Sequence, residues 1–186
     1  MKKHNVRRLL VLVLVDRIPM HYLWSLIVFL AACITDTLDG NIARKRNLVT
    51  DFGKLMDPLA DKIMVMSALV CFVANGMTNT VFVLLIMVRE FAVTSIRLIA
   101  VEQGRVIPAN NWGKAKTVSQ IVAICIVLLT QYILDLGAYG ILALPTETLS
   151  PIFTWVNFVV MAIATLLAVV SGIIYAKDAK DLFTEL

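Results

Sequence analysis

Residues 152–176 read IFTWVNFVVMAIATLLAVVSGIIYA, an apolar run without one charged side chain. A helix needs roughly 20 predominantly apolar residues to cross the hydrocarbon core of a bilayer, and this run is long enough. Four more runs approach that length, at residues 20–38, 58–75, 80–100 and 116–136. Hydrophobic residues make up 60% of the chain and charged residues 16%, against about 45–50% and about 25% in soluble domains. The sequence therefore predicts an all-α, polytopic membrane helical bundle.

The connections between these runs alternate in charge. Residues 75–80 carry no charged side chain, and residues 135–150 carry only Asp135 and Glu147. The other connections are basic, with Arg44, Lys45, Arg46, Lys54, Arg105, Lys114, Lys177 and Lys180. Cytoplasmic loops carry the Lys/Arg excess of membrane proteins, and threading the five runs in order puts every basic connection on one side. The pattern predicts a multi-pass protein of the cell membrane whose basic face is cytoplasmic.

The first 19 residues fit this threading less well. They are basic, so they should be cytoplasmic, and one more crossing is then needed before Met20. Only residues 9–15 are continuously apolar, and seven residues rise about 10 Å in a helix, against a hydrocarbon core of about 30 Å. We expect either an eroded first span or a reading frame that begins downstream of the true start. The predicted organisation is one membrane domain, 1–186, with a basic segment and shortened first span (1–19), five transmembrane helices (20–176) and a cytoplasmic tail (177–186).

Cysteine usage and net charge exclude other classes. Cys33, Cys71 and Cys125 stand singly within apolar runs, which argues against a disulfide framework and a zinc site. The net charge of +4 comes from the predicted cytoplasmic connections, so it favours contact with anionic lipid and not with nucleic acid.

Four aspartates flank the first basic connection. Asp36 and Asp39 are three residues apart at the end of one run, and Asp57 and Asp61 are four apart at the start of the next. Each pair shares one face of its helix, and two antiparallel neighbours can turn those faces toward each other. Four carboxylates at the edge of a low-dielectric region cannot all stay ionised without cations. An all-oxygen, anionic set prefers Mg²⁺ or Mn²⁺, and two such ions suit phosphoryl-type transfer.

The residues around the aspartates fit that chemistry. Gly40 and Gly53 leave room for a bulky ligand, and Arg44 could hold a phosphate bidentately. Pro58 sits most easily in a first helical turn, or else it lies inside a helix that starts near Thr50. The alternative is that the four aspartates are solvated acids at helix ends without a functional role. It does not account for the spacing, the glycines and the arginine together.

The motif Asp36-x₂-Asp39-Gly40-x₂-Ala43-Arg44-x₈-Gly53-x₃-Asp57-x₃-Asp61 resembles the full signature of the CDP-alcohol phosphotransferases. The resemblance implies a six-helix membrane fold, here with a shortened first span, that is usually homodimeric and has its active site at the cytoplasmic face. It also implies that the four aspartates hold two divalent metals that grip the donor's pyrophosphate, and that Asp61 takes the acceptor's hydroxyl proton. The implied nucleotide pocket consists of Asp39, Gly40, Ala43, Arg44 and Gly53.

The acceptor alcohol has to be read from other residues. Arg89 and Glu90 lie in the middle of the run 80–100, where charges usually face a bundle interior or a water-filled cavity. A cationic zone that could hold an acceptor's phosphate is predicted from Arg89, Arg97, Arg105, Lys114 and Lys116. Serine, choline or ethanolamine would not need such a zone. The alternative is that Arg89 and Glu90 form structural pairs with other helices, and that the lysines are ordinary positive-inside residues.

Residues 34–120 resemble the bacterial phosphatidylglycerophosphate synthases of this family. The resemblance implies a reaction of CDP-diacylglycerol with glycerol 3-phosphate that gives phosphatidylglycerophosphate and CMP. The nearest alternative is a cardiolipin synthase, whose acceptor is phosphatidylglycerol, or another family member with a different acceptor. Two further hypotheses are an ion transporter, disfavoured because the acids gather at one face without an internal repeat, and a catalytically inactive partner subunit.

Small residues follow one another along the last apolar run. Ala164, Ala168, Ser171 and Gly172 would let another helix approach closely. We expect a helix contact there, either within the chain or in a dimer.

Overall fold

The computed structural model describes residues 20–45, 51–103, 111–141 and 145–180, and it describes side chains in 20–35, 62–103, 111–141 and 145–180. The secondary structure of these parts of the chain is entirely α-helical, which confirms the predicted all-α class. The helices, in chain order, are α2 (His21–Lys45), α3 (Asp51–Ala74), α4 (Thr80–Glu102), α5 (Asn111–Ala138) and α6 (Thr146–Asp178). The predicted shortened first span, in residues 1–19, lies outside the described residues.

Each predicted run lies almost wholly within one helix, but the helices extend beyond the apolar stretches. Helix α2 continues to Lys45, and α3 begins at Asp51. Pro58 therefore lies inside α3, so its predicted place in a first helical turn is wrong, and the alternative of a helix starting near Thr50 is confirmed. Hydropathy alone underestimated these two helices because the C-terminal part of α2 and the N-terminal part of α3 are polar.

The uncharged connection between α3 and α4 is a tight turn. Gly76 adopts φ +68°, a backbone conformation open to glycine at little cost, and the Met77 amide donates to the Phe72 carbonyl at 2.8 Å. The Asn79 side chain then accepts a hydrogen bond from the Val81 amide at 2.8 Å and caps α4. These bonds satisfy backbone groups at both helix ends and make α3 and α4 run in opposite directions.

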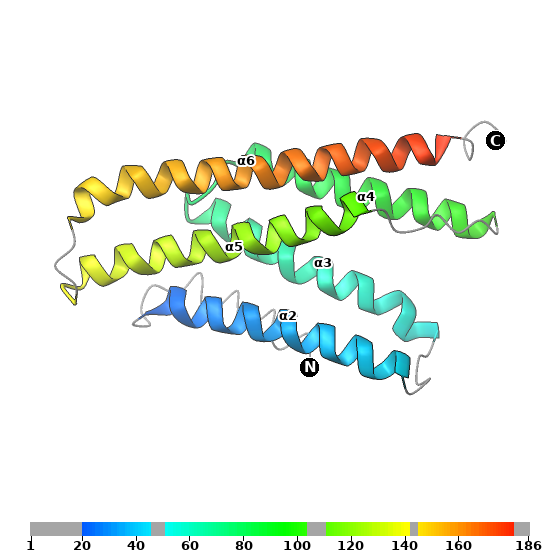
Figure 1. Cartoon of the computed structure of the whole chain (residues 1–186), viewed down its shortest axis with the longest axis horizontal. Coiled ribbons are helices and arrows are strands. Elements are labelled where there is room, and N and C mark those ends of the chain that lie inside the picture. Colours follow the sequence, from blue (N-terminus) through cyan, green and yellow to red (C-terminus); the bar gives the residue numbers. More distant parts are fainter. Residues whose placement is uncertain (1–19, 46–50, 104–110, 142–144, 181–186) are drawn as a thin grey trace.

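The long helices lie along a common direction, and successive helices reverse (Figure 1). The longest helix, α6, packs against α5 and α4, while α5 also contacts α2 and α3. The C-terminal ends of α2, α4 and α6 and the N-terminal end of α3 lie toward the same end of the molecule, at the right of Figure 1. Lys45, Lys177 and the aspartate-bearing halves of α2 and α3 therefore share one end of the bundle.

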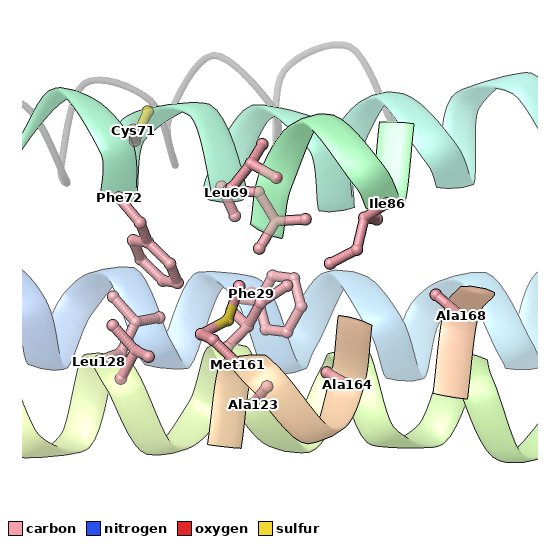
Figure 2. Packing of buried hydrophobic residues seen from close by; sticks show 14 of the residues in the cluster. Phe29, Leu69, Cys71, Phe72, Ile86, Ala123, Leu128, Met161, Ala164 and Ala168 are labelled. Carbon is pink, nitrogen blue, oxygen red and sulfur yellow. The ribbon is translucent and has the colours of Figure 1, made fainter. Parts of the chain in front are cut away.

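All five helices contribute to a single main core (Figure 2). Phe29 of α2 and Phe72 of α3 are fully buried, as are Leu128 of α5 and Met161 of α6. A buried hydrogen bond of 2.9 Å from Thr130 Oγ1 to Asn157 Oδ1 adds a polar link between α5 and α6. Large and small side chains thus interdigitate where α6 crosses its neighbours.

The outer surface of the bundle is strongly apolar. Helices α5 and α6 are long and apolar enough to cross a membrane, and only 28% and 33% of their most apolar windows are buried within the chain. The core helix of a soluble protein would instead be mostly buried. Among the described residues α5 and α6 are the two helices long and apolar enough to span a bilayer, whereas α4 is interrupted by Arg89, Glu90 and Arg97. Exposed apolar side chains such as Val88, Phe91 and Leu98 nevertheless cover the outside of α4.

Candidate active site

The predicted aspartates lie in two helices at matching levels. Asp39 is six residues before the end of α2 and Asp57 is six residues after the start of α3, so each lies about 9 Å from its helix end. Asp36 and Asp61 lie one turn further in, at about 14 Å and about 15 Å. Because Lys45 and Asp51 are six residues apart, the two helix ends are within about 22 Å of each other. The two pairs thus lie at matching distances from helix ends that a short connection keeps close.

The side chains of the aspartates lie outside the described residues, so the metal site and the nucleotide pocket remain predictions. The same is true of Gly40, Ala43 and Arg44 within α2 and of Gly53 within α3. The donor set, four carboxylates on two continuous helices, fits hard divalent ions by its chemistry. Their spacing of three and four residues in unbroken helices keeps each pair on one helix face.

A charged cluster in the bundle interior is centred on the Glu90 carboxylate. Lys116 of α5 donates a hydrogen bond to Glu90 Oε1, and Arg89 Nη1 lies 3.0 Å from the same oxygen. Lys62 Nζ is 3.9 Å from Glu90 Oε2 and also donates to Thr94 Oγ1. The Glu90, Lys116 and Arg89 side chains are 7%, 8% and 10% exposed and that of Lys62 is 29% exposed. Among the side chains that the structure describes, three cations thus surround one buried anion, a net charge of +2.

A cavity of about 240 Å³ opens beside this cluster. It lies between α3, α4 and α5, and its lining residues are Lys62, Val65, Met66, Ile86, Glu90, Lys116, Thr117 and Gln120. Charged groups gather on one part of its wall, and apolar side chains form the remainder. Asp61 immediately precedes Lys62 in α3, so their Cα atoms are about 3.8 Å apart. The cationic cavity therefore lies next to the part of α3 that carries the predicted metal ligand Asp61.

Arg89 reaches across α6. Its Nη2 donates to Ser171 Oγ at 2.7 Å, and its aliphatic stem passes over Gly172, where a Cβ atom would lie 2.8 Å from Arg89 Cγ. The predicted close helix contact is thus found between α4 and α6 of the same chain. Arg89 and Glu90 do pair with other helices, as one interpretation of the sequence held. Glu90 and its partner Lys116 also line the cavity.

Replacing Gly172 with alanine is expected to displace Arg89 and to lower the free energy of unfolding by about 1–3 kcal/mol, the usual cost of overpacking. Thermal unfolding in detergent measures this. Gly113→Ala is the matched control, because Gly113 also lies in a helix and an added Cβ there meets nothing within 4 Å. The control should be neutral or slightly stabilising. Equal midpoints for the two variants would contradict the packing described here.

The remaining predicted phosphate ligands do not all reach the cavity. Arg97 is exposed; its Nε lies 3.4 Å from the hydroxyl of Tyr175 on α6, and its guanidinium carbon is 5.8 Å from the ring centre. Lys114 is exposed on the surface of α5, two residues from the buried Lys116. Arg105 lies outside the described residues. Of the five predicted residues, the structure brings Arg89 and Lys116 together around Glu90.

Among the cavity residues with a charged or amide side chain, two were missed from the sequence. Lys62 follows the last aspartate of the motif directly, and Gln120 stands one helical turn after Lys116. The spacing of Gln120 from Lys116 was a usable signal, because residues three or four apart share a helix face, whereas Lys62 had only its place next to the motif. Nothing in the sequence pattern distinguished Lys62 from an ordinary positive-inside lysine.

A sequence model described as CDP-alcohol phosphatidyltransferase matches residues 6–176. The chain belongs to the CDP-alcohol phosphatidyltransferase family. Several similar proteins are named CDP-diacylglycerol–glycerol-3-phosphate 3-phosphatidyltransferase. The protein of Bacillus subtilis is 46% identical over 114 residues, and that of Mycoplasma pneumoniae is 44% identical over 98 residues. The protein of Rickettsia bellii is 32% identical over 165 residues.

These phosphatidyltransferase alignments differ in extent. They cover 61%, 53% and 89% of this chain for the Bacillus, Mycoplasma and Rickettsia proteins, respectively. The chain in turn spans 59% and 43% of the first two relatives and 83% of the third. Together with the apolar helices α5 and α6, membership in this phosphatidyltransferase family indicates that the chain associates with membranes.

Proposed function

We propose that this protein transfers a phosphatidyl group from CDP-diacylglycerol to sn-glycerol 3-phosphate, giving phosphatidylglycerophosphate and CMP. The observation that carries the proposal is the cationic cavity, because its lining residue Lys62 directly follows Asp61 in α3. Lys62 and Lys116 line it, and Arg89 shares their counter-ion, Glu90. Relatives that carry the name of this activity support the same reaction.

Charge balance favours an acceptor with a phosphate monoester. Lys62, Arg89 and Lys116 carry three positive charges against one on Glu90, which leaves +2 in a largely desolvated region. The phosphate of glycerol 3-phosphate carries nearly two negative charges near neutral pH and would neutralise this excess. Phosphatidylglycerol offers one negative charge on a diester and brings two acyl chains. Serine and choline bring no phosphate at all.

The proposed reaction gives the cationic cluster and Asp61 different roles. The cationic cluster holds the acceptor's phosphate and so orients its primary hydroxyl toward the aspartates. Asp61 takes the proton of that hydroxyl. The hydroxyl oxygen of the acceptor then attacks the phosphorus that bears diacylglycerol. The bond from this phosphorus to the bridging pyrophosphate oxygen breaks, and CMP leaves with the electron pair. Arg44 and the glycines Gly40 and Gly53 are proposed to hold the departing nucleotide.

Two divalent ions, Mg²⁺ or Mn²⁺, are part of the proposal. Asp36, Asp39, Asp57 and Asp61 would hold them, and bound ions supply polarisation of the pyrophosphate and neutralisation of the leaving group. The matching levels of the two pairs on α2 and α3 support this ligand set.

We further propose a multi-pass, six-span protein of the cell membrane with its active site facing the cytoplasm, acting as a homodimer. The gathering of Lys45, Lys177 and the aspartate-bearing helix halves at one end of the bundle supports the orientation. The six spans and the dimer rest on the family resemblance.

The deciding experiment is CMP release by the purified protein in lipid-containing micelles with CDP-diacylglycerol and Mg²⁺ or Mn²⁺. Glycerol 3-phosphate, phosphatidylglycerol, serine and inositol phosphate are compared as acceptors. Turnover with glycerol 3-phosphate, abolished by chelator, is the expected result. Turnover with phosphatidylglycerol instead would indicate a cardiolipin synthase, and no turnover with any acceptor would indicate a non-catalytic chain.

The substitution Lys116→Met is expected to raise the KM for glycerol 3-phosphate about 10- to 100-fold, because it removes one charge-assisted hydrogen bond to the phosphate. The KM for CDP-diacylglycerol should change little. Lys177→Met, at an exposed lysine near the end of α6, is the matched control. Steady-state kinetics with each substrate varied in turn gives both constants. An equal rise in both KM values would argue against a phosphate subsite in this cavity.

A further inference from the structure

The side chain of Gln120 has an unmet hydrogen-bonding group in the cavity. Gln120 is 4% exposed, lies one turn beyond Lys116 on α5 and lines the cavity with Lys62 and Glu90. Its Nε2 is buried and has no hydrogen-bond partner among the described residues. Buried polar atoms are nearly always paired in folded proteins. An unpaired amide nitrogen, in a side chain that is more than nine-tenths buried and borders a cavity, therefore points to a ligand.

The chemistry of this amide differs from that of its neighbours. Lys62, Arg89 and Lys116 supply charged donors, which suit phosphate oxygens. A glutamine side chain is neutral and offers both donors and an acceptor, so it matches a hydroxyl group, which also donates and accepts. The cavity thus presents two kinds of recognition, a cationic cluster and a neutral amide about one helical turn apart.

We propose that Gln120 is a specificity-determining residue that hydrogen-bonds the secondary hydroxyl of the acceptor, the hydroxyl that does not react. This inference rests on the proposed function, since it takes glycerol 3-phosphate as the acceptor. A site that hydrogen-bonds a substrate hydroxyl discriminates strongly against an analogue without it, because the analogue leaves the site's polar groups unpaired. Gln120 would then select a glycerol-type acceptor from other small phosphomonoesters with a primary hydroxyl.

The test compares glycerol 3-phosphate with 3-hydroxypropyl phosphate, which keeps the phosphate and the primary hydroxyl but lacks the secondary hydroxyl. For the unmodified protein, kcat/KM should be about 10- to 100-fold higher with glycerol 3-phosphate. For Gln120→Met, which keeps the side-chain length, kcat/KM with glycerol 3-phosphate should fall by about that factor. The value with 3-hydroxypropyl phosphate should stay within about threefold, so the preference disappears.

Two further variants complete the design. Gln131→Met makes the same change on α5 at a half-buried position outside the cavity lining, and it should leave the preference intact. Gln120→Asn keeps the amide but withdraws it by one methylene, so it should lose part of the preference. Gln120→Asn also takes the place of Gln120→Met in the comparison if Gln120→Met does not fold. The midpoint of thermal unfolding in detergent shows whether it folds.

The outcomes separate the inference from the function on which it rests. An equal loss with both acceptors in Gln120→Met would overturn the inference, because it would show that Gln120 orders the cavity without reading the hydroxyl. No loss with either acceptor would overturn it as well, and would mean that the amide is paired only by water. If the unmodified protein used neither acceptor but released CMP with another alcohol, both the proposed function and this inference would fall.

Discussion

Replacing Asp61 with asparagine is expected to lower the rate of CMP release by at least about a thousandfold. Loss of a positioned general base alone costs about 10²–10⁴ in rate, and the same carboxylate is proposed as a metal ligand. Binding of glycerol 3-phosphate should change much less, because the proposed phosphate ligands Lys62, Arg89 and Lys116 all remain. The measurement is CMP release under saturating donor and acceptor, with acceptor binding followed by calorimetry.

Asp178→Asn is the matched control for this substitution. Asp178 is an exposed carboxylate at the end of α6, far along the sequence from the aspartate motif. Its replacement makes the same chemical change and should leave turnover unchanged. If the Asp61 variant retained more than about a tenth of the rate, a loss far smaller than removal of a general base produces, the assignment of the base to this residue would be wrong.

The substitution Glu90→Gln is expected to lower the free energy of unfolding by about 3–5 kcal/mol, the usual effect of removing one partner from a buried ion pair. It leaves Lys116 and Arg89 buried without their counter-charge. Combining it with Lys116→Met removes part of that repulsion, so the double variant should be more stable than the sum of the single effects predicts. We expect a coupling energy of about 1–3 kcal/mol, measured as unfolding free energies in detergent.

Glu102→Gln provides the comparison on the same helix. Glu102 is exposed at the end of α4, and its neutralisation should change stability by no more than about 0.5 kcal/mol. Additive effects of the Glu90 and Lys116 substitutions would show that the two side chains are not coupled, and would remove the argument for a cluster of net charge +2.

The helices could be predicted because hydropathy and helical span length act over some 20 residues at a time. The run 152–176 lies wholly inside α6, and the run 80–100 wholly inside α4. The ends of α2 and α3 could not be found in this way, since polar and glycine-containing sequence continues the helix there without an apolar signal. Pro58 shows the difficulty most clearly: its local preference for a first turn is overridden by the helix in which it lies.

The site was predictable only in part, for a related reason. The aspartates stand in one short stretch of sequence, so their grouping is visible in a single pattern. The Glu90 cluster draws Lys62, Arg89 and Lys116 from three helices, and Ser171 joins from a fourth. Helical periodicity tells which residues share a face, but not which face meets which neighbour. The positions of Lys114 and Lys116 illustrate this, because one is exposed and the other buried although both are lysines two residues apart.

The length of α6 has a consequence for the surrounding bilayer. Its apolar run, residues 152–176, extends about 38 Å, beyond a hydrocarbon core of about 30 Å. Helices usually relieve such hydrophobic mismatch by tilting or by shifting along their neighbours. Here the arginine stem that crosses Gly172 and bonds Ser171 fixes the register of α6 against α4, so the helix cannot shift without dismantling the wall of the cavity. Tilting remains as the adjustment, and α4 has to tilt together with α6 because one side chain links the two helices.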